Sequence, residues 1–143
     1  MKDPDISVLE TQVFAPRTVA LIGLSSRGDA PTGRPLKFLR RAGYAGQIHV
    51  VNPARETVQG EPSLKSIHDA PEPPEHAYIL VGQDRVEQAV QECADAGVRV
   101  ASILADGFGE AGAEGRARQD RLVDIARSAG MRLLGPNSMG IAD

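Results

Sequence analysis

The segment Thr18–Gly43, TVALIGLSSRGDAPTGRPLKFLRRAG, decides the fold. It begins with an apolar run of strand length, Thr18–Gly23, continues through small and polar residues, and ends in a helical stretch, Gly33–Gly43. Pro35 in the first helical turn and Gly43 at the helix end are typical start and stop signals. The segment therefore predicts a strand, a loop of small residues and a helix in direct succession, which is the basic unit of an α/β sheet.

The loop of this unit is similar to a phosphate-binding loop but matches neither familiar pattern. Gly28 and Gly33 have the spacing of a Walker loop, yet Arg34 follows where that pattern requires Lys. The G-x-G-x-x-G dinucleotide fingerprint could start at Gly23, but Ser25 replaces its second glycine. Small residues still let the backbone approach a ligand closely, and the next helix offers free N–H groups at its start. We therefore expect this loop to hold a phosphorylated ligand.

Strand-like and helix-like segments alternate along the rest of the chain. Further strands are predicted at Gln47–Asn52, Ala77–Gly82, Val98–Ala105 and Met131–Gly135. Amphipathic helix faces are predicted at Val86, Ala89, Val90, Cys93 and Gly97, and at Arg118, Leu122, Ile125, Ala126 and Ala129. The proline-rich segment before the third strand has room only for a helical turn around Leu64–Asp69. This alternation predicts a doubly wound α/β sheet of about five parallel strands with helices on both faces.

The carboxyl ends of parallel strands share one edge, where sheets of this kind bind their ligands. The segments that follow the five predicted strands read GLSSRG, NPAR, VGQD, ADGFGE and GPNSMG, and all are rich in small or polar residues. Before the first strand, Ile6, Leu9, Val13 and Phe14 share one helical face. We therefore expect a docking helix over residues 1–14 and a single ligand-binding domain over residues 15–143.

Composition argues against several classes of protein. Aromatic residues make up 3% of the 143 residues and Trp is absent, so stacking platforms for single-stranded nucleic acid are not expected. The net charge of −3 offers no basic field for nucleic acid or an anionic membrane, and no apolar run approaches the ~20 residues of a membrane span. The N-terminus is polar and acidic, unlike a secretory signal, and a single Cys fits a reducing compartment. We expect a cytoplasmic location.

The end of the second predicted strand distinguishes among nucleotide ligands. In NAD sites an acidic residue there accepts hydrogen bonds from the ribose hydroxyls. Here the chain reads Val51, Asn52, Pro53, Ala54 and Arg55, without a carboxylate and with a basic residue. A ribose that carries a phosphate, as in NADP and coenzyme A, suits such a loop better, because an arginine can pair with the phosphate.

Five ordered stretches resemble a known family: FAPRTVALIGLSSR, GYAGQIHVVNP, VQGEPSLKSI, AGVRVASILADGFGEAG and GPNSMGIAD. They are similar to the N-terminal CoA-binding domain of NDP-forming acyl-CoA synthetases, the group of ADP-forming acetyl-CoA synthetase and succinyl-CoA ligase. The resemblance runs from about Phe14 to Asp143 and implies a Rossmann-like fold that binds coenzyme A. The residues that it places in the CoA loops are Gly23, Ser25, Ser26, Arg27, Val51, Asn52, Pro53, Arg55, Val81, Gly82, Gln83, Asp106 and Gly107. It also implies that Asn137 lies near the thioester chemistry, and we add Arg34 as a source of charge for the diphosphate.

The sequence departs from the family pattern in two loops. Gly82 stands where the family usually has Pro, and Asp106 lies in a loop that usually reads Ser-Ala-Gly-Phe. Ser138 stands where the family often has Cys, but no His or Asp is placed to activate it. The phosphohistidine of the family lies in a following domain, so we predict no catalytic residue in this chain. The sequence contains no cluster of metal-ligating residues, so we predict no metal site.

The resemblance implies the CoA-binding piece of a longer acid–thiol ligase, whose remaining domains or subunit would supply the nucleotide site and the phosphohistidine. Coenzyme A or an acyl-CoA would be the ligand, with neither nucleic acid nor membrane as partner. Three alternatives stay open at this point: a regulatory module of a protein acetyltransferase, a free-standing CoA-binding protein, and an NADP-binding oxidoreductase domain. We expect the chain alone to have no ligase activity.

Overall fold

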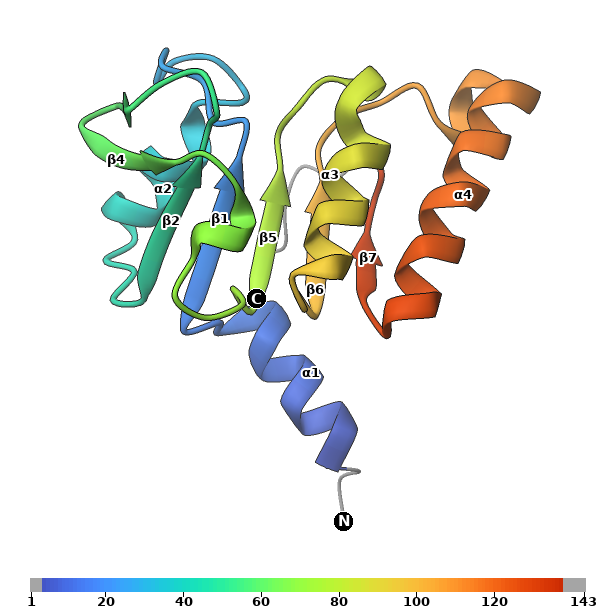
Figure 1. The fold of residues 1–143 in the computed structure, drawn as a ribbon, viewed down its shortest axis with the longest axis horizontal. Coiled ribbons are helices and arrows are strands. Elements are labelled where there is room, and N and C mark those ends of the chain that lie inside the picture. Colours follow the sequence, from blue (N-terminus) through green and yellow to red (C-terminus); the bar gives the residue numbers. More distant parts are fainter. Residues whose placement is uncertain (1–3, 138–143) are drawn as a thin grey trace.

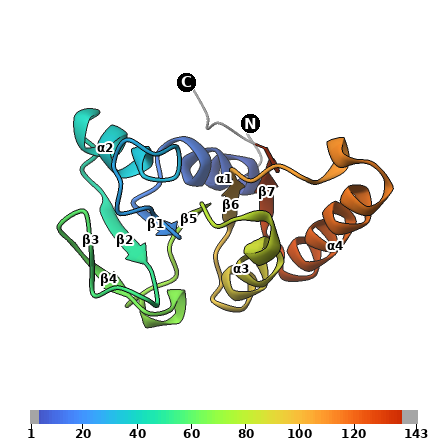
Figure 2. The ribbon, with the colours of Figure 1, turned by 90° about the horizontal axis from the view of Figure 1, so that it is seen from above.

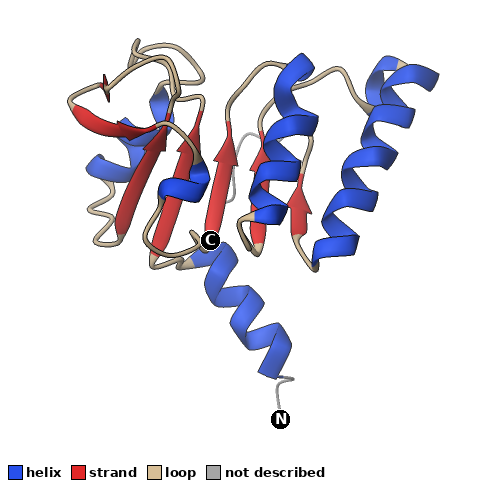
Figure 3. Cartoon of the chain, in the orientation of Figure 1, coloured by secondary structure: helices blue, strands red, loops and turns tan. Residues whose placement is uncertain are grey.

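A twisted sheet forms the centre of the computed structural model, which describes residues 4–137 (Figure 1, Figure 3). Within these residues the sheet has seven strands in the order β3-β4-β2-β1-β5-β6-β7. The strands are β1 (Thr18–Ile22), β2 (Gln47–Val51), β3 (Thr57–Val58), β4 (Glu61–Leu64), β5 (His76–Ile79), β6 (Val100–Ile103) and β7 (Arg132–Leu134). The helices are α1 (Pro4–Phe14), α2 (Arg34–Arg41), α3 (Gln83–Asp95) and α4 (Ala113–Ala129), with short 3-10 turns η1 (Ile67–Asp69) and η2 (Gly109–Ala111). All pairings are parallel except that of β3 with β4.

Helices cover both faces of this sheet, as Figure 2 shows from above: α3 and α4 lie on one side and α2 on the other, while α1 extends below the sheet. The larger core packs the inward residues of α3 and α4 against the central strands. The smaller core forms on the opposite face, where Leu36 of α2 packs against Leu21 and Val50. Because strands β1, β2, β5 and β6 point the same way, their carboxyl ends form one edge of the sheet. The predicted α/β fold with helices on both faces is confirmed.

The five predicted strands correspond to β1, β2, β5, β6 and β7. The expectation for the segment before β5 was incomplete, because a hairpin of β3 and β4 precedes the predicted helical turn. These strands have two and four residues, and Pro62 lies within β4. Of the two, β4 pairs with β2, through Val50 opposite Ser63 and Val51 opposite Leu64, and β3 pairs with β4. Such short strands depend on a distant partner rather than on local pattern, so the sequence did not reveal them.

The helix α1 projects below the amino ends of the strands (Figure 1). The predicted apolar face is only partly covered: Leu9 and Val13 are half-buried, whereas Ile6 and Phe14 are each 54% exposed. The end of α1 lies near the amino end of β5. That the helix docks through this face stays a prediction.

A buried polar pair lies on the sheet face near the end of α1. The Nε2 atom of His76 is 2.7 Å from the Ser102 hydroxyl, and the imidazole stacks on Tyr78 with ring centroids 4.6 Å apart. Burial lowers the pKa of His76 to about 4, and the backbone of Gln12 and Val13 offsets part of this effect. His76 is fully buried, so its environment favours the neutral ring.

This pair predicts a loss of stability in mild acid. Because the folded-state pKa of His76 lies below its unfolded value of 6.5, the protein is most stable above pH 6.5 and loses stability as the pH falls toward about 4. When the pH falls from about 7.5 to about 5, we expect the titration of His76 to lower the free energy of unfolding by about 2 kcal/mol. Urea unfolding at both pH values should show this difference between the wild type and a variant with His76→Phe and Ser102→Ala. Equal acid losses in the two proteins would contradict it.

Candidate functional site

A pocket of about 580 Å³ opens at the carboxyl edge of the sheet, between the ends of β1, β2 and β5 and the first turns of α3. Its walls combine apolar residues at the strand ends with small and charged residues of the loops. The lining residues are Ile22, Gly23, Leu24, Ser25, Ser26, Val51, Asn52, Pro53, Ala54, Arg55, Lys65, Ser66, Val81, Arg85, Gln88, Ala89 and Glu92. The structure thus brings together eight of the predicted site residues: Gly23, Ser25, Ser26, Val51, Asn52, Pro53, Arg55 and Val81.

Gly23 forms the floor of the first loop in a conformation that requires glycine. Its φ angle is 81°, and a Cβ atom added to it would lie 2.6 Å from Cγ1 of Val81. Its N–H donates to the Val51 carbonyl oxygen at 3.0 Å, which ties the end of β1 to β2. Gly23 also lines the pocket, and without a side chain its backbone is open to a ligand.

Asn52 shapes the second loop through an Asx turn. Its Oδ1 accepts a hydrogen bond from the Ala54 N–H at 3.0 Å, while its own N–H donates to the Leu64 carbonyl oxygen at 2.9 Å. The Ser63 hydroxyl donates to the Asn52 carbonyl oxygen at 3.2 Å. The turn therefore directs the chain away from the sheet at Asn52 and carries Arg55 to the pocket wall.

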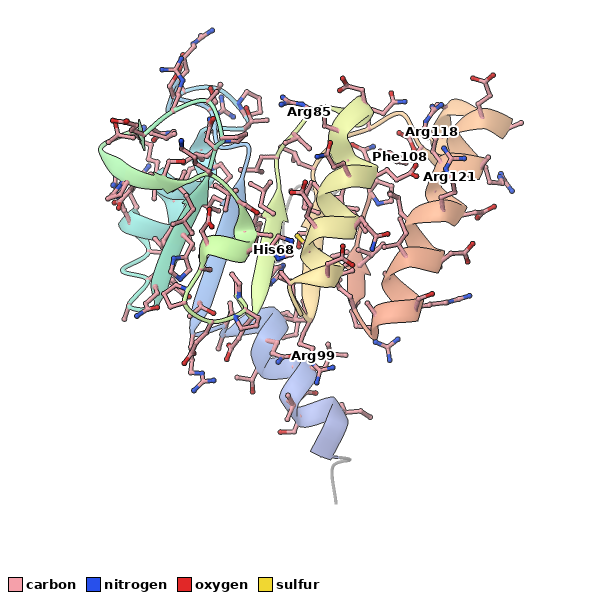
Figure 4. All side chains as sticks on the ribbon, in the orientation of Figure 1. His68, Arg85, Arg99, Phe108, Arg118 and Arg121 are labelled. Atoms are coloured by element: carbon pink, nitrogen blue, oxygen red, sulfur yellow. The ribbon has the colours of Figure 1, made fainter. Side chains whose placement is uncertain are left out.

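Three cations surround this pocket: Arg55 after β2, Lys65 after β4, and Arg85 in the first turn of α3. Figure 4 shows Arg85 at the upper end of α3, beside the carboxyl ends of the strands. All three are exposed, and none forms an ion pair with another residue of the described range 4–137. Only Glu92 contributes a carboxylate to the lining. The arrangement suits a ligand with several negative charges.

Arg27 and Arg34 lie outside the lining of this pocket. The Nη2 atom of Arg27 is 3.2 Å from the Asp29 carboxylate, and Nε of Arg34 donates to the Asp29 carbonyl oxygen at 3.0 Å. Both groups of Arg27 and Asp29 are more than 70% exposed, so this ion pair contributes little to stability. The sequence predicted that both arginines contribute charge to a diphosphate site, but it could not show that they turn toward Asp29.

The third and fourth loops meet beside the pocket rather than within it. The Arg118 guanidinium donates to the Gly107 carbonyl oxygen at 2.6 Å and lies 2.9 Å from the Gln83 amide, so α4 links the two loops. Figure 4 shows Arg118 and Phe108 close together between α3 and α4. Of the predicted residues in these loops, Gly82, Gln83 and Asp106 are exposed and Gly107 is partly buried. None of these four lines the pocket.

The fourth loop holds its own carboxylate. Glu110 accepts hydrogen bonds from the N–H groups of Gly107 at 2.5 Å and Phe108 at 3.2 Å. The N–H of Glu110 itself, together with these bonds from Phe108 and Gly107, lowers the pKa of its carboxyl group. The fifth loop joins the fourth through Asn137, whose N–H donates to the Ala105 carbonyl oxygen at 2.8 Å. Ser138 lies outside the described residues.

Two kinds of feature are absent from the described residues 4–137: a metal site and a membrane-spanning helix. These residues contain no cluster of three or more side chains that could ligate a metal ion. None of their helices combines the length and apolar character that crossing a membrane requires.

Comparison with known proteins shows the family of the chain. Residues 17–143 match the family described as CoA binding domain. The chain belongs to this family. The match covers the whole sheet, from the residue before β1 to the end of the chain.

Longer enzymes contain similar CoA-binding domains. The chain is 38% identical over 90% of its length to the alpha subunit of acetate–CoA ligase (ADP-forming) II of Pyrococcus furiosus, and covers 28% of that protein. It is 35% identical over 91% of its length to acetate–CoA ligase (ADP-forming) I of Archaeoglobus fulgidus, and covers 19% of it. This CoA-binding domain is therefore homologous to the N-terminal part of NDP-forming acyl-CoA synthetases, as the sequence motifs indicated.

A solved structure shares the fold closely. Acetyl-coenzyme A synthetase 1 of Ca. Korarchaeum cryptofilum, solved with phosphate and ADP, superposes with a TM-score of 0.83 at 31% identity. The superposition covers 89% of this chain and 27% of the synthetase. The CoA-binding domain thus spans less than a third of the length of each of these three relatives.

Sequence reasoning missed two of the three cations in the pocket of this CoA-binding domain, Lys65 and Arg85. Lys65 follows a strand that was not predicted, so nothing indicated that it reaches the carboxyl edge. Arg85 lies three residues after Gly82 of the third loop, in the first turn of a helix that was predicted. One signal could have indicated Arg85: it is a basic residue in the first helical turn after a predicted ligand-binding loop.

Proposed function

We propose that the domain binds coenzyme A in the pocket at the carboxyl edge of the sheet. The observation that carries this proposal is the group of three cations, Arg55, Lys65 and Arg85, which converge on one pocket without an ion-pair partner among the described residues. Coenzyme A carries a diphosphate and a ribose phosphate, so it presents negative charge at two separate points. The three cations repel one another, whereas each can form charge-assisted hydrogen bonds with such phosphates.

The loops suit the two charged parts of the ligand differently. Gly23 lets a ligand approach closely, and Ser25 and Ser26 offer hydroxyl groups to a diphosphate. Asn52 and Arg55 lie at the end of β2, where sheets of this type place the ribose. A neutral amide followed by a cation favours a phosphorylated ribose over a ribose with free hydroxyls.

We infer further that the domain serves a ligase in the cytoplasm. Its role would be to present the CoA thiol to an acyl group that is activated in the remaining domains or in a second subunit. Support comes from the ADP-forming acetate–CoA ligases to which the domain is similar over nine-tenths of its length. The acid that such a ligase activates is a property of the whole enzyme.

Calorimetric titration with coenzyme A, dephospho-CoA, NAD and NADP tests the ligand. We expect coenzyme A to bind most tightly and dephospho-CoA more weakly, because the latter lacks the ribose phosphate. Arg55→Ala should weaken coenzyme A by about tenfold, the scale of one charge-assisted hydrogen bond. Arg41→Ala provides the matched control, since Arg41 is an exposed arginine at the end of α2 and does not line the pocket. Tighter binding of NADP than of coenzyme A would reject the proposal in favour of an oxidoreductase domain.

A further inference from the structure

The hairpin between β3 and β4 carries a glutamine in a backbone conformation that favours glycine. Its two-residue turn consists of Gln59 and Gly60, with φ angles of 52° and 82°. Positive φ at both central residues is characteristic of a type I′ turn, which favours Asn, Asp and Gly. Gln59 and Asn137 are the non-glycine residues with positive φ in the described part of the chain. A residue in such a conformation requires support from its surroundings.

The Gln59 side chain provides that support by reaching into the loop between β1 and α2. Its Nε2 donates to the carbonyl oxygen of Ser25 at 2.7 Å and to that of Gly33 at 3.0 Å. Gly28 lies against the same amide, because a Cβ atom added to it would be 3.3 Å from Gln59 Oε1. One side chain therefore contacts both ends and the middle of a loop that lies 26 to 34 residues earlier in the sequence.

This contact is important because the loop has no apolar anchor between its ends. Every residue from Ser25 to Thr32 is at least partly exposed, whereas Leu24 just before them is buried. One backbone hydrogen bond, from the Ser25 N–H to the Thr32 carbonyl oxygen at 3.1 Å, joins the two sides of the loop. The part of the loop that lines the pocket, Ser25 and Ser26, is thus next to the point where the Gln59 amide binds.

We propose that Gln59 is a positioning residue for the phosphate-binding loop Ser25–Gly33. The inference rests on the proposed CoA function of the pocket. The amide holds the Ser25 carbonyl in place, so the pocket-lining residues Ser25 and Ser26 are ordered before the ligand arrives. A loop that is already ordered loses less conformational entropy on binding, so the affinity for the ligand is higher.

The turn itself does not need glutamine, so the amide can be removed without disturbing the turn. Such variants distinguish a positioning role of Gln59 from a purely structural one. Gln59→Gly removes the amide, and Gln59→Asn keeps it one methylene too short, while both residues suit a positive φ. We expect either variant to keep or raise the midpoint of thermal unfolding. Amide hydrogen exchange in Ser25–Gly33 should become faster while exchange in α4 stays unchanged. The affinity for coenzyme A should fall by roughly tenfold, the factor expected for one to two net hydrogen bonds.

Gly60→Asn is the matched control. It lies in the same turn with the same sign of φ, and no atom lies within 4 Å of its added Cβ, so loop exchange and affinity should match the wild type. Wild-type exchange and affinity in both Gln59 variants would overturn the inference, as would a lowered unfolding midpoint with faster exchange throughout the sheet. If wild-type protein fails to bind coenzyme A, the proposed function falls, and the exchange comparison alone decides whether Gln59 positions the loop.

Discussion

Asn52→Asp is expected to weaken binding of coenzyme A by about a hundredfold and to affect dephospho-CoA far less. Asn52 lines the pocket at the end of β2, next to the loop that carries Arg55. A carboxylate has the size of the amide and can still accept the hydrogen bond from the Ala54 N–H, so the Asx turn is preserved. Two like charges ~5 Å apart at an effective dielectric of about 20 repel by about 3 kcal/mol, before screening by salt.

The ratio of the two affinities isolates this charge effect. A disturbed turn before Pro53 would weaken both ligands equally and leave the ratio unchanged, whereas repulsion of the ribose phosphate acts on coenzyme A alone. Gln47→Glu serves as the control, because it adds the same charge to the exposed, opposite end of the same strand. The two ends of β2 are about 15 Å apart, beyond the screening length at physiological salt. An unchanged ratio in Asn52→Asp would mean that the ribose phosphate lies elsewhere.

Gly23→Ala is expected to lower the free energy of unfolding by about 4 kcal/mol. The positive φ of 81° costs an alanine about 1 to 2 kcal/mol. In addition, the new Cβ would lie 2.6 Å from Cγ1 and 3.1 Å from the backbone nitrogen of Val81. Moving a central strand end to relieve this overlap costs about 1 to 3 kcal/mol more.

Gly43→Ala separates the two contributions, because Gly43 has a φ of 70° but no atom within 4 Å of an added Cβ. Urea unfolding of both variants should show a loss of about 1 kcal/mol for Gly43→Ala and a several-fold larger loss for Gly23→Ala. Similar losses would show that β1 and β5 can separate at little cost. In that case the close approach of Gly23 and Val81 would not be a rigid part of the pocket floor.

Local patterns were sufficient for the main elements of the fold. The run Thr18–Gly23 has the length and apolar character typical of a buried strand, and the spacing of Val86, Val90 and Cys93 places them on one helical face. All three are buried as that spacing requires. Because alternating strands and helices have few stable arrangements, these elements also determined which loops share an edge. The first two loops and Val81 of the third could therefore be assigned to one pocket from sequence.

What only the tertiary structure decided are the contacts between residues far apart in the chain. The hairpin of β3 and β4 is too short to be recognised without its partner β2, so the place of Lys65 in the pocket and the reach of Gln59 into the first loop were hidden. Arg27 has the charge that its loop favours, but its side chain turns to Asp29. Sequence patterns record which face of an element is buried, since burial follows a fixed period. They do not record where a long polar side chain ends, because that depends on which carbonyl or carboxylate the folded chain brings within hydrogen-bonding distance.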